Sequence, residues 1–137
     1  MNKRKLLTVI LTWNDFDNTS KCLESCKKSQ SENTTFLLVD NNSTDGSLEK
    51  IVDKFKLKDI SNESYNLESN KFIFIKNSVN LGCGFGHNTG YEFAIKNKFE
   101  YVARIDNDMQ FGPGFFDENL IILDKHPNIE GLSPKIM

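Results

Sequence analysis

Two carboxylates one residue apart, Asp106 and Asp108, directly follow a short apolar stretch at residues 101–105. Tyrosine, valine and isoleucine favour a pleated, half-buried strand, and the chain then changes at once to turn-forming residues. In open α/β sheets, ligands lie beyond the carboxyl ends of the strands. Paired carboxylates there suit a hard divalent cation whose coordination is completed by substrate phosphates and waters. We therefore predict that Asp106 and Asp108 hold a metal-bound diphosphate, in preference to an Asp-Asn-Asp turn with a purely structural purpose.

Two other expected strands also end in polar residues, at residues 12–14 and 40–42. Because the carboxyl ends of parallel strands lie at one edge of a sheet, we expect these clusters to converge with the turn at 106–108. Asp40 stands at the strand end itself, where its carboxylate can accept hydrogen bonds from a nucleobase N–H or a ribose hydroxyl, so we predict ligand contact. Ser43 and Asp45 are predicted to cap the unmatched amides of the following helix.

A glycine-bearing run at residues 80–90 precedes an expected helix. It is not the G-x-G-x-x-G dinucleotide fingerprint, since His87 stands where the third glycine belongs and the run does not follow the first strand. Its glycines permit close approach of the backbone to a ligand or to a neighbouring strand. His87 and Asn88 are expected at a helix N-terminus, where amide donors favour anions. A solvated helix-start residue is an equally open interpretation of His87.

The segments that position these residues alternate between strand and helix. Strands are expected at residues 5–12, 35–39, 72–76 and 101–106, with a further strand-like run at 129–136. Helices are expected at residues 19–28, 47–55, 87–98 and 115–125, the first capped by Asp17, Asn18 or Thr19, and a surface loop at 56–71. This alternation argues for an α/β domain with a mainly parallel sheet and right-handed crossovers.

Composition and charge exclude several classes of protein. Of the 137 residues, 38% are hydrophobic and 26% charged, which is ordinary for one soluble globular domain. The 17 basic and 19 acidic residues give a net charge of -2 without a basic cluster, so nothing points to nucleic acid. No segment is long enough to cross a membrane. The apolar run at residues 6–11 is interpreted as a buried first strand rather than a signal peptide, because no small-residue cleavage site follows it.

The cysteines are Cys22, Cys26 and Cys83, an odd and sparse set. In a chain without a recognised secretion signal, they indicate reduced thiols and a cytoplasmic location. Cys22 and Cys26 share a helix face with Leu23, which favours core packing. A zinc site would need further ligands at suitable spacing.

Four pieces of sequence together resemble one known family. They are VILTWN at residues 9–14, VDNNSTDGS at 39–47, NLG at 80–82 with GHNTG at 86–90, and IDND at 105–108. In this order and spacing, over essentially the whole chain, they resemble the family 2 glycosyltransferases of the GT-A fold, in particular the rhamnosyltransferase-like branch. The resemblance implies a Rossmann-like, three-layer α/β/α fold. It also implies an enzyme that moves a sugar from a nucleotide-diphosphate donor to a hydroxyl acceptor with inversion.

The resemblance also assigns roles to individual residues. The implied donor-binding residues are Thr12, Trp13, Asn14, Asp40, Asn42, Gly82, His87, Asn88, Asp106 and Asn107. The D-x-D motif of the family corresponds to Asp106 and Asp108, which would bind Mn²⁺ or Mg²⁺. The implied donor is a UDP-, GDP- or dTDP-linked sugar, and the implied acceptor is a saccharide or a lipid-linked molecule. The implied setting is cell-surface polysaccharide synthesis, in the cytoplasm at the inner face of the membrane.

The chain departs from the family pattern at its end. Family members continue into an acceptor-binding half that includes the expected carboxylate base, whereas this sequence ends at Met137 and no residue is assigned as the base. We therefore expect residues 1–137 to be a single donor-binding domain, truncated and without the acceptor-binding half. An open sheet edge left by truncation is expected to favour self-association into a homo-oligomer.

Three alternatives remain open from the sequence. The first is a nucleotide-sugar binding fragment without catalysis. The second is a phosphatase of the haloacid dehalogenase type, which also uses D-x-D, but after its first strand and with Thr or Val where Gln110 stands here. The third is a phospho-receiver domain with Asp40 or Asp106 as acceptor and Lys135 as its late lysine, which leaves the run at residues 80–90 unexplained.

Overall fold

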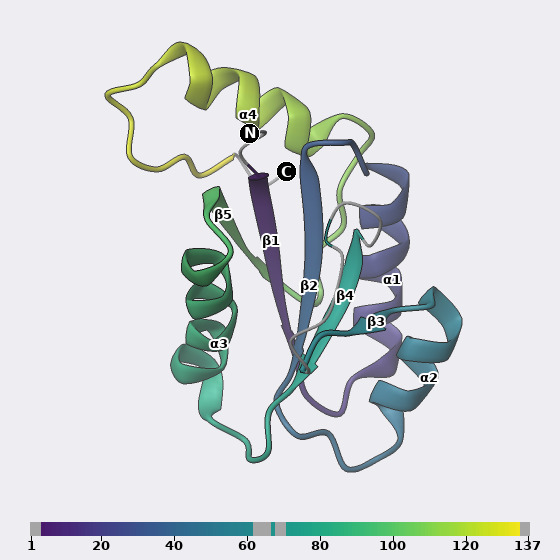
Figure 1. The fold of residues 1–137 in the computed structure, drawn as a ribbon. Helices are drawn as coiled ribbons and strands as arrows, with labels where there is room; N and C mark the ends of the chain where they lie inside the picture. The colour runs from purple at the N-terminus through teal and green to yellow at the C-terminus, as the bar shows by residue number, and fades with distance from the viewer. Residues whose placement is uncertain (1–3, 62–66, 68–70, 135–137) are drawn as a thin grey trace.

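A computed structural model describes residues 4–61, 67 and 71–134, and its strands and helices alternate along the chain (Figure 1). The strands are β1 (Arg4–Thr12), β2 (Thr34–Asp40), β3 (Lys58–Asp59), β4 (Phe72–Lys76) and β5 (Phe99–Asp106). The helices are α1 (Phe16–Lys28), α2 (Ser47–Phe55), α3 (Gly82–Lys96) and α4 (Phe115–Lys125). Among the described residues, no helix is both long and apolar enough to span a membrane.

The described strands form one parallel sheet in the order β3-β4-β2-β1-β5. β1 lies between β2 and β5, so that Ile10 pairs with Leu38 on one side and with Ile105 on the other. All three side chains are buried, as expected for strands that are covered on both faces. The predicted parallel α/β sheet is confirmed, and it places the carboxyl ends of β1, β2 and β5 at one edge.

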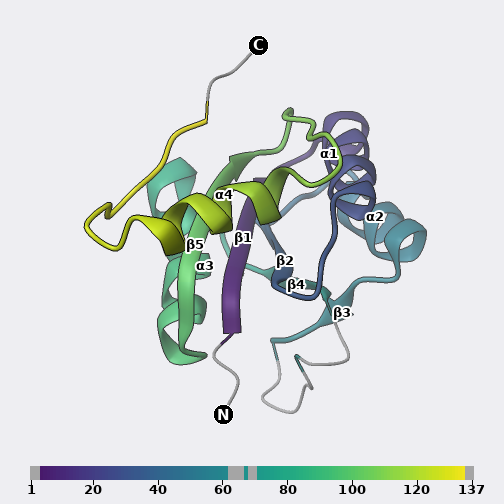
Figure 2. The ribbon, with the colours of Figure 1, turned by 90° about the horizontal axis from the view of Figure 1, so that it is seen from above.

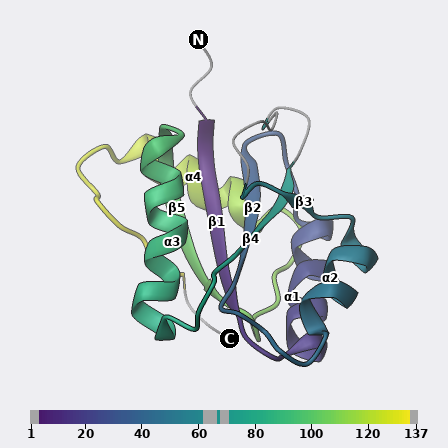
Figure 3. The same ribbon diagram turned by 60° about the horizontal axis from the view of Figure 1, so that its bottom comes forward.

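Helices cover both faces of the sheet, which gives the predicted three layers (Figures 1 and 3). One face packs against α1, α2 and α4 in a cluster that includes Leu23 and Phe116. The other face packs against α3 through residues such as Phe93. Cys22 and Cys26 are buried free thiols within the first cluster, so the core packing predicted for this pair is confirmed.

Two glycines allow α3 to lie directly on β1. A Cβ atom at Gly90 would stand 2.3 Å from Cγ1 of Val9, and one at Gly86 would stand 2.7 Å from Cδ1 of Leu11. Both distances are shorter than van der Waals contact, so a side chain at either position would push the helix off the strand. The close approach that these glycines permit is therefore to a neighbouring strand.

The start of α3 differs from the prediction. The helix begins at Gly82, not at His87, and the glycines of the predicted loop form its first turns. Glycine has a low helix propensity, but packing of the helix on β1 outweighs that preference here. His87 and Asn88 consequently lie inside the helix, and the prediction that they stand at its N-terminus was wrong.

Three further segments also differ from the prediction. α1 begins at Phe16 with Asp15 as its N-cap, in place of residues 17–19. The loop predicted at residues 56–71 contains the short strand β3, which pairs with β4. Residues 129–134 are exposed and form no strand, because they pair with no described strand; residues 135–136 lie outside the described part of the chain.

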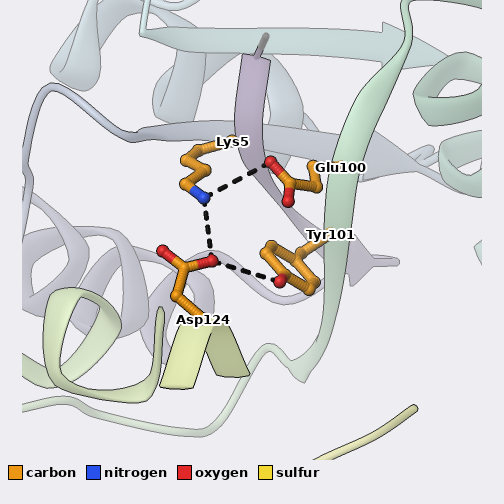
Figure 4. Close-up of polar contacts among 4 residues, drawn as sticks. All are labelled: Lys5, Glu100, Tyr101 and Asp124. Atoms are coloured by element: carbon orange, nitrogen blue, oxygen red, sulfur yellow. Dashed lines mark hydrogen bonds and ion pairs between the residues drawn. The ribbon is translucent and has the colours of Figure 1, made fainter. Parts of the chain in front are cut away.

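An ion-pair cluster fastens α4 to the sheet at the end opposite the carboxyl edge (Figure 4). Nζ of Lys5 lies 2.9 Å from Oδ1 of Asp124 and 3.3 Å from Oε2 of Glu100, and the hydroxyl of Tyr101 donates to the same Asp124 oxygen at 3.2 Å. The hydrogen bond from Lys5 lowers the pKa of Asp124, and the same bond raises the pKa of Lys5. These contacts hold α4 where it crosses β5 and β1, as Figure 2 shows from above.

Candidate functional site

A cavity of about 480 Å³ lies beyond the carboxyl ends of β1 and β5. Its walls come from the loop after β1, the loop after β2, the segment that enters α3, and the turn after β5. The lining residues are Leu11, Thr12, Trp13, Asp15, Asn41, Asn80, Gly82, Cys83, His87, Asp106, Asn107 and Asp108. The predicted convergence of the strand ends is therefore observed, at the edge where open α/β sheets bind ligands.

Most residues predicted from the sequence line this cavity, and some do not. Those that line it are Thr12, Trp13, Gly82, His87, Asp106, Asn107 and Asp108. Those outside its lining are Asn14, Asp40, Asn42 and Asn88. Five further lining residues were not predicted from the sequence: Leu11, Asp15, Asn41, Asn80 and Cys83. The missed residues stand within or beside the quoted motifs, so the signal was present but did not separate lining residues from their neighbours.

Asp106 and Asp108 are both exposed at the end of β5 and line the same cavity. The turn that carries them is held by the N–H of Met109, which donates to the carbonyl of Asp106 at 3.1 Å. Among the described residues, no group of three or more His, Cys, Asp or Glu is placed to hold a metal ion. Two carboxylates beside an open cavity are a ligand set with which proteins can hold a cation of the Mg²⁺ type, when phosphates and waters complete the coordination.

Asn107, between the two carboxylates, is turned toward the start of α1. Its Nδ2 donates to Oδ2 of Asp15 and to Oγ1 of Thr19, each at 3.0 Å. Oγ1 of Thr19 lies 2.7 Å from Oγ1 of Thr12, and both hydroxyls are buried. The two protons of the Asn107 amide are thus engaged within the protein, although the residue also lines the cavity.

Asp15 receives several hydrogen bonds at this junction. Its Oδ1 accepts the backbone N–H of Asn18 at 3.2 Å, and its Oδ2 accepts the Asn18 side-chain amide at 3.0 Å as well as that of Asn107. Partial burial opposes ionisation of the Asp15 carboxyl, but the hydrogen bonds from Asn18 and Asn107 together outweigh it and lower the pKa. Asp15 therefore presents a carboxylate rather than a neutral acid at the cavity wall.

Asn41 organises the segment that enters α3. Its Nδ2 donates to Oδ1 of Asn80 and to the carbonyl of Gly82, each at 3.0 Å, and its Oδ1 accepts the N–H of Leu81 at 2.9 Å. Asn41 is buried, so these bonds replace those it would make with water. The residue thus ties the end of β2 to the N-terminus of α3 across a wall of the cavity.

His87 is 2% exposed and lines the cavity from the second turn of α3. Its Nδ1 lies 2.9 Å from the carbonyl oxygen of Cys83. Because a carbonyl only accepts hydrogen bonds, Nδ1 carries the proton in this contact. Nε2 is buried and has no partner among the described residues. In the neutral ring, that nitrogen is an acceptor that a ligand N–H or O–H can satisfy.

Asp40 and its neighbours organise the loop after β2. Asp40 is 0% exposed; its Oδ2 accepts the N–H of Ser43 at 2.9 Å, and its Oδ1 has no partner among the described residues. Oγ of Ser43 accepts the N–H of Asn14 at 2.9 Å, which joins two loops instead of capping α2. Oδ1 of Asp45 accepts the N–H of Ser47, the first residue of α2, at 2.9 Å, so Asp45 satisfies a helix-start amide as predicted, although the N-cap itself is Gly46. Ligand contact by Asp40 stays a prediction.

Asn14 and Asn42 shape their loops through left-handed backbone angles, with φ values of 48° and 66°. Asparagine tolerates this conformation better than most residues. Oδ1 of Asn14 also accepts the N–H of Thr44 at 2.8 Å. Donor contact by Asn14, Asn42 and the exposed Asn88 stays a prediction.

Residues 8–129 match the sequence model of the family described as glycosyl transferase family 2. The chain belongs to glycosyl transferase family 2. The match covers most of this chain and includes every residue that lines the cavity. A comparison with curated proteins found no match.

Solved structures show that the family 2 chain has the GT-A fold. TarS from S. aureus has a TM-score of 0.69 and 20% identity, over 90% of this chain and 20% of that one. TarS 1-349 in complex with UDP-GlcNAc has a TM-score of 0.70 and 20% identity, over 90% and 32%. The mannosyltransferase PcManGT from Pyrobaculum calidifontis, in complex with GDP-Man and Mn2+, has a TM-score of 0.61 and 14% identity, over 82% and 30%. The chain therefore spans a third or less of each of these solved chains.

Proposed function

We propose that this family 2 chain binds a nucleotide-diphosphate sugar at the cavity and takes part in transfer of the sugar to a hydroxyl acceptor with inversion. The observation that carries the proposal is the exposed pair Asp106 and Asp108, which stands at the end of β5 in one cavity with the start of α3. Two structural relatives support it, since TarS 1-349 was solved with UDP-GlcNAc and PcManGT with GDP-Man and Mn2+.

The nucleoside is proposed to lie between Trp13 and His87. Trp13 is 52% exposed and lines the cavity, so its indole offers an apolar face for a base or ribose. Nε2 of His87 and Oδ1 of Asp40 are buried acceptors without a partner among the described residues. Uracil, thymine and guanine each present a ring N–H, whereas cytosine and adenine present a ring acceptor at the equivalent place. Nε2 of His87, which belongs to a residue that lines the cavity, therefore favours UDP-, dTDP- or GDP-linked donors, whereas Asp40 lies outside the lining.

The diphosphate is proposed to lie between the carboxylate pair and the N-terminus of α3. Asp106 and Asp108 would hold Mn²⁺ or Mg²⁺, which as a Lewis acid stabilises charge on the departing diphosphate by several kcal/mol. Gly82 and Cys83 line the cavity at the first turn of α3, where the positive end of the helix dipole favours an anion, although the N–H of Gly82 itself donates to Oδ1 of Asn80 at 2.8 Å. These residues orient the donor and balance its charge.

The acceptor side is proposed more broadly. A hydroxyl of a saccharide or lipid-linked molecule requires a general base about 3 Å from its proton, and we assign no residue of this chain to that role. We propose that residues 1–137 supply the donor-binding part of the reaction, in cell-surface polysaccharide synthesis at the cytoplasmic face of the membrane. Binding of a nucleotide sugar without catalysis is the second candidate, since the residues that line the cavity account for donor binding.

Thermal-shift titration tests the donor proposal. Unfolding is followed with UDP, dTDP, GDP, CDP and ADP, each with Mn²⁺ and with a chelator. A ligand that binds only the folded state at 100 times its Kd adds about 2.7 kcal/mol of stability. We expect stabilisation by one of the first three nucleotides, strengthened by Mn²⁺. Equal shifts with the metal chelated, or no shift with any nucleotide, would contradict the proposal. Incubation with labelled UDP-GlcNAc or GDP-mannose then separates transfer or hydrolysis from binding alone.

A further inference from the structure

The turn that carries the carboxylate pair is bonded directly to the end of the loop after β1 and, through Thr19 of α1, to its beginning. Nδ2 of Asn107 donates to Oδ2 of Asp15, at the end of that loop, at 3.0 Å. The same nitrogen donates to Oγ1 of Thr19 at 3.0 Å, and Thr19 lies 2.7 Å from Thr12, at the beginning of the loop. Trp13 stands between Thr12 and Asp15 and lines the cavity. The Asn107 amide thus connects the two ends of the loop that carries Trp13, one directly and the other through Thr19.

The residue types at this junction are chemically matched. The Asn107 amide has two protons, and it meets two acceptors, a carboxylate and a hydroxyl. The bond to the Asp15 carboxylate is charge-assisted, which makes it stronger than a neutral hydrogen bond. An aspartate at position 107 would instead set two carboxylates against each other, and an alanine would leave the acceptors of Asp15 and Thr19 without this donor. With a carboxylate at position 15, position 107 therefore requires an uncharged side chain with a two-proton donor.

We propose that Asn107 is a positioning residue that locks the Asp106 and Asp108 carboxylates to the loop carrying Trp13. The proposal rests on the proposed function, because it concerns how the protein binds the diphosphate and the nucleoside of the same donor. The carboxylates would face the diphosphate and Trp13 the nucleoside, and Asn107 sets their separation. Its consequence is energetic coupling: a metal ion at the carboxylates strengthens nucleotide binding only while the two segments are held together.

The only tryptophan of the chain, Trp13, provides a direct readout. Its fluorescence is titrated with UDP and with GDP, each in Mn²⁺ and in EDTA. For each nucleotide, the coupling ratio is the Kd in EDTA divided by the Kd in Mn²⁺. In Asn107→Ala and Asn107→Asp we expect this ratio to fall by about tenfold, the factor that corresponds to losing one hydrogen bond to a charged group. The Kd in EDTA should change by less than about threefold, since the loop itself keeps its Thr12–Thr19 contact. A general loss of folding would weaken both Kd values.

A pair swap isolates the contact itself. In Asp15→Asn combined with Asn107→Asp, the amide and the carboxylate exchange places, and Asn remains a good N-cap for α1. We expect the coupling ratio to return to within about threefold of the parent protein, a non-additive result that shows direct interaction. Gln110→Glu is the matched control, since it adds an exposed carboxylate near the pair without contact to Asp15 and should leave the ratio unchanged.

The outcomes separate this proposal from the proposed function. If the parent protein binds neither nucleotide, the donor function fails, and the positioning role falls with it. If the parent protein binds in a Mn²⁺-dependent manner but the Asn107 variants keep the full coupling ratio, only the positioning role is overturned. Failure of the pair swap to restore the ratio, while Asn107→Asp lowers it and Gln110→Glu does not, would also overturn it.

Discussion

Nδ1 of His87 lies 2.9 Å from the carbonyl oxygen of Cys83, one turn earlier on the same helix. This contact places the imidazole proton on Nδ1 and leaves Nε2 as a buried acceptor without a partner among the described residues. A buried acceptor of this kind costs stability until a ligand donates to it. Under the proposed function, this acceptor would face a nucleobase that carries a ring N–H.

His87→Leu should weaken binding of UDP and GDP while affecting CDP little. The substitution removes one neutral hydrogen bond, worth about 0.5–1.5 kcal/mol, so we expect a loss of roughly threefold to tenfold in affinity. The measurement is the ratio of UDP to CDP affinity by isothermal titration. Glu92→Gln, an exposed position further along α3, is the control and should keep the parent ratio. An unchanged ratio in His87→Leu would place the base elsewhere.

Asp108→Ala should abolish the effect of Mn²⁺ on nucleotide binding and leave the fold intact. The side chain is exposed at the cavity, and substitutions at such positions change stability by about 0.5 kcal/mol or less. Binding of UDP and GDP is measured with increasing Mn²⁺, together with circular dichroism and the Tm. Asp117→Ala, on α4 away from the cavity lining, controls for loss of a carboxylate. Persisting Mn²⁺ dependence in Asp108→Ala would locate the cation at other residues.

Gly90→Ala should destabilise the protein, whereas Gly84→Ala should not. A Cβ atom at Gly90 would stand 2.3 Å from Cγ1 of Val9, while one at Gly84 meets nothing within 4 Å. Overpacking of a buried contact costs about 1–3 kcal/mol. In contrast, alanine in a helix gains about 0.5–1 kcal/mol over glycine. Urea unfolding of both variants measures the difference, and equal midpoints would mean that α3 does not rest on β1 as described.

The Lys5–Asp124 ion pair should make stability depend on pH at both extremes. The pKa of Asp124 is lowered from 3.8, so its contribution is complete above that pH and is lost as the pH falls below it. The pKa of Lys5 is raised from 10.5, so its contribution is complete below that pH and is lost as the pH rises through the higher folded value. The Tm of Asp124→Asn should therefore fall less than that of the parent protein when the pH is lowered from 7 to about 3. Glu130→Gln is the exposed control, and parallel curves for Asp124→Asn and the parent protein would refute the contribution.

Self-association through an open sheet edge was predicted from the sequence, and the edge strand β5 allows a direct test. Among the described residues, β5 pairs only with β1, and Val102 on it is 42% exposed. If two β5 strands paired antiparallel about Val102, Glu100 of one copy would face Arg104 of the other, which is a favourable cross-strand pair. Sedimentation velocity over a range of concentrations should show a dimer, weakened by Val102→Lys. A monomer at all concentrations, or a dimer unaffected by this substitution, would contradict the prediction.

The order of elements was predictable because strand and helix patterns are local. The apolar run of β1 and the polar residues at its end lie next to each other in the sequence, as do the strand and turn of Ile105 to Asp108. The position of α3 was not predictable in the same way. Its glycine-rich first turns oppose helix formation locally, and only the contact of Gly86 and Gly90 with β1 makes them helical.

The same distinction between local pattern and tertiary packing applies to the candidate site. The sequence alone determined that carboxylates and amides gather beyond the ends of the parallel strands, since residue type and alternation decide which residues end a strand. The tertiary structure alone decided which of their atoms face the cavity. Asn107 meets Asp15 across 92 positions of sequence, and Asn41 meets Gly82 across 41. Hydrogen bonds over such separations depend on packing of the helices against the sheet, and no local pattern encodes that geometry.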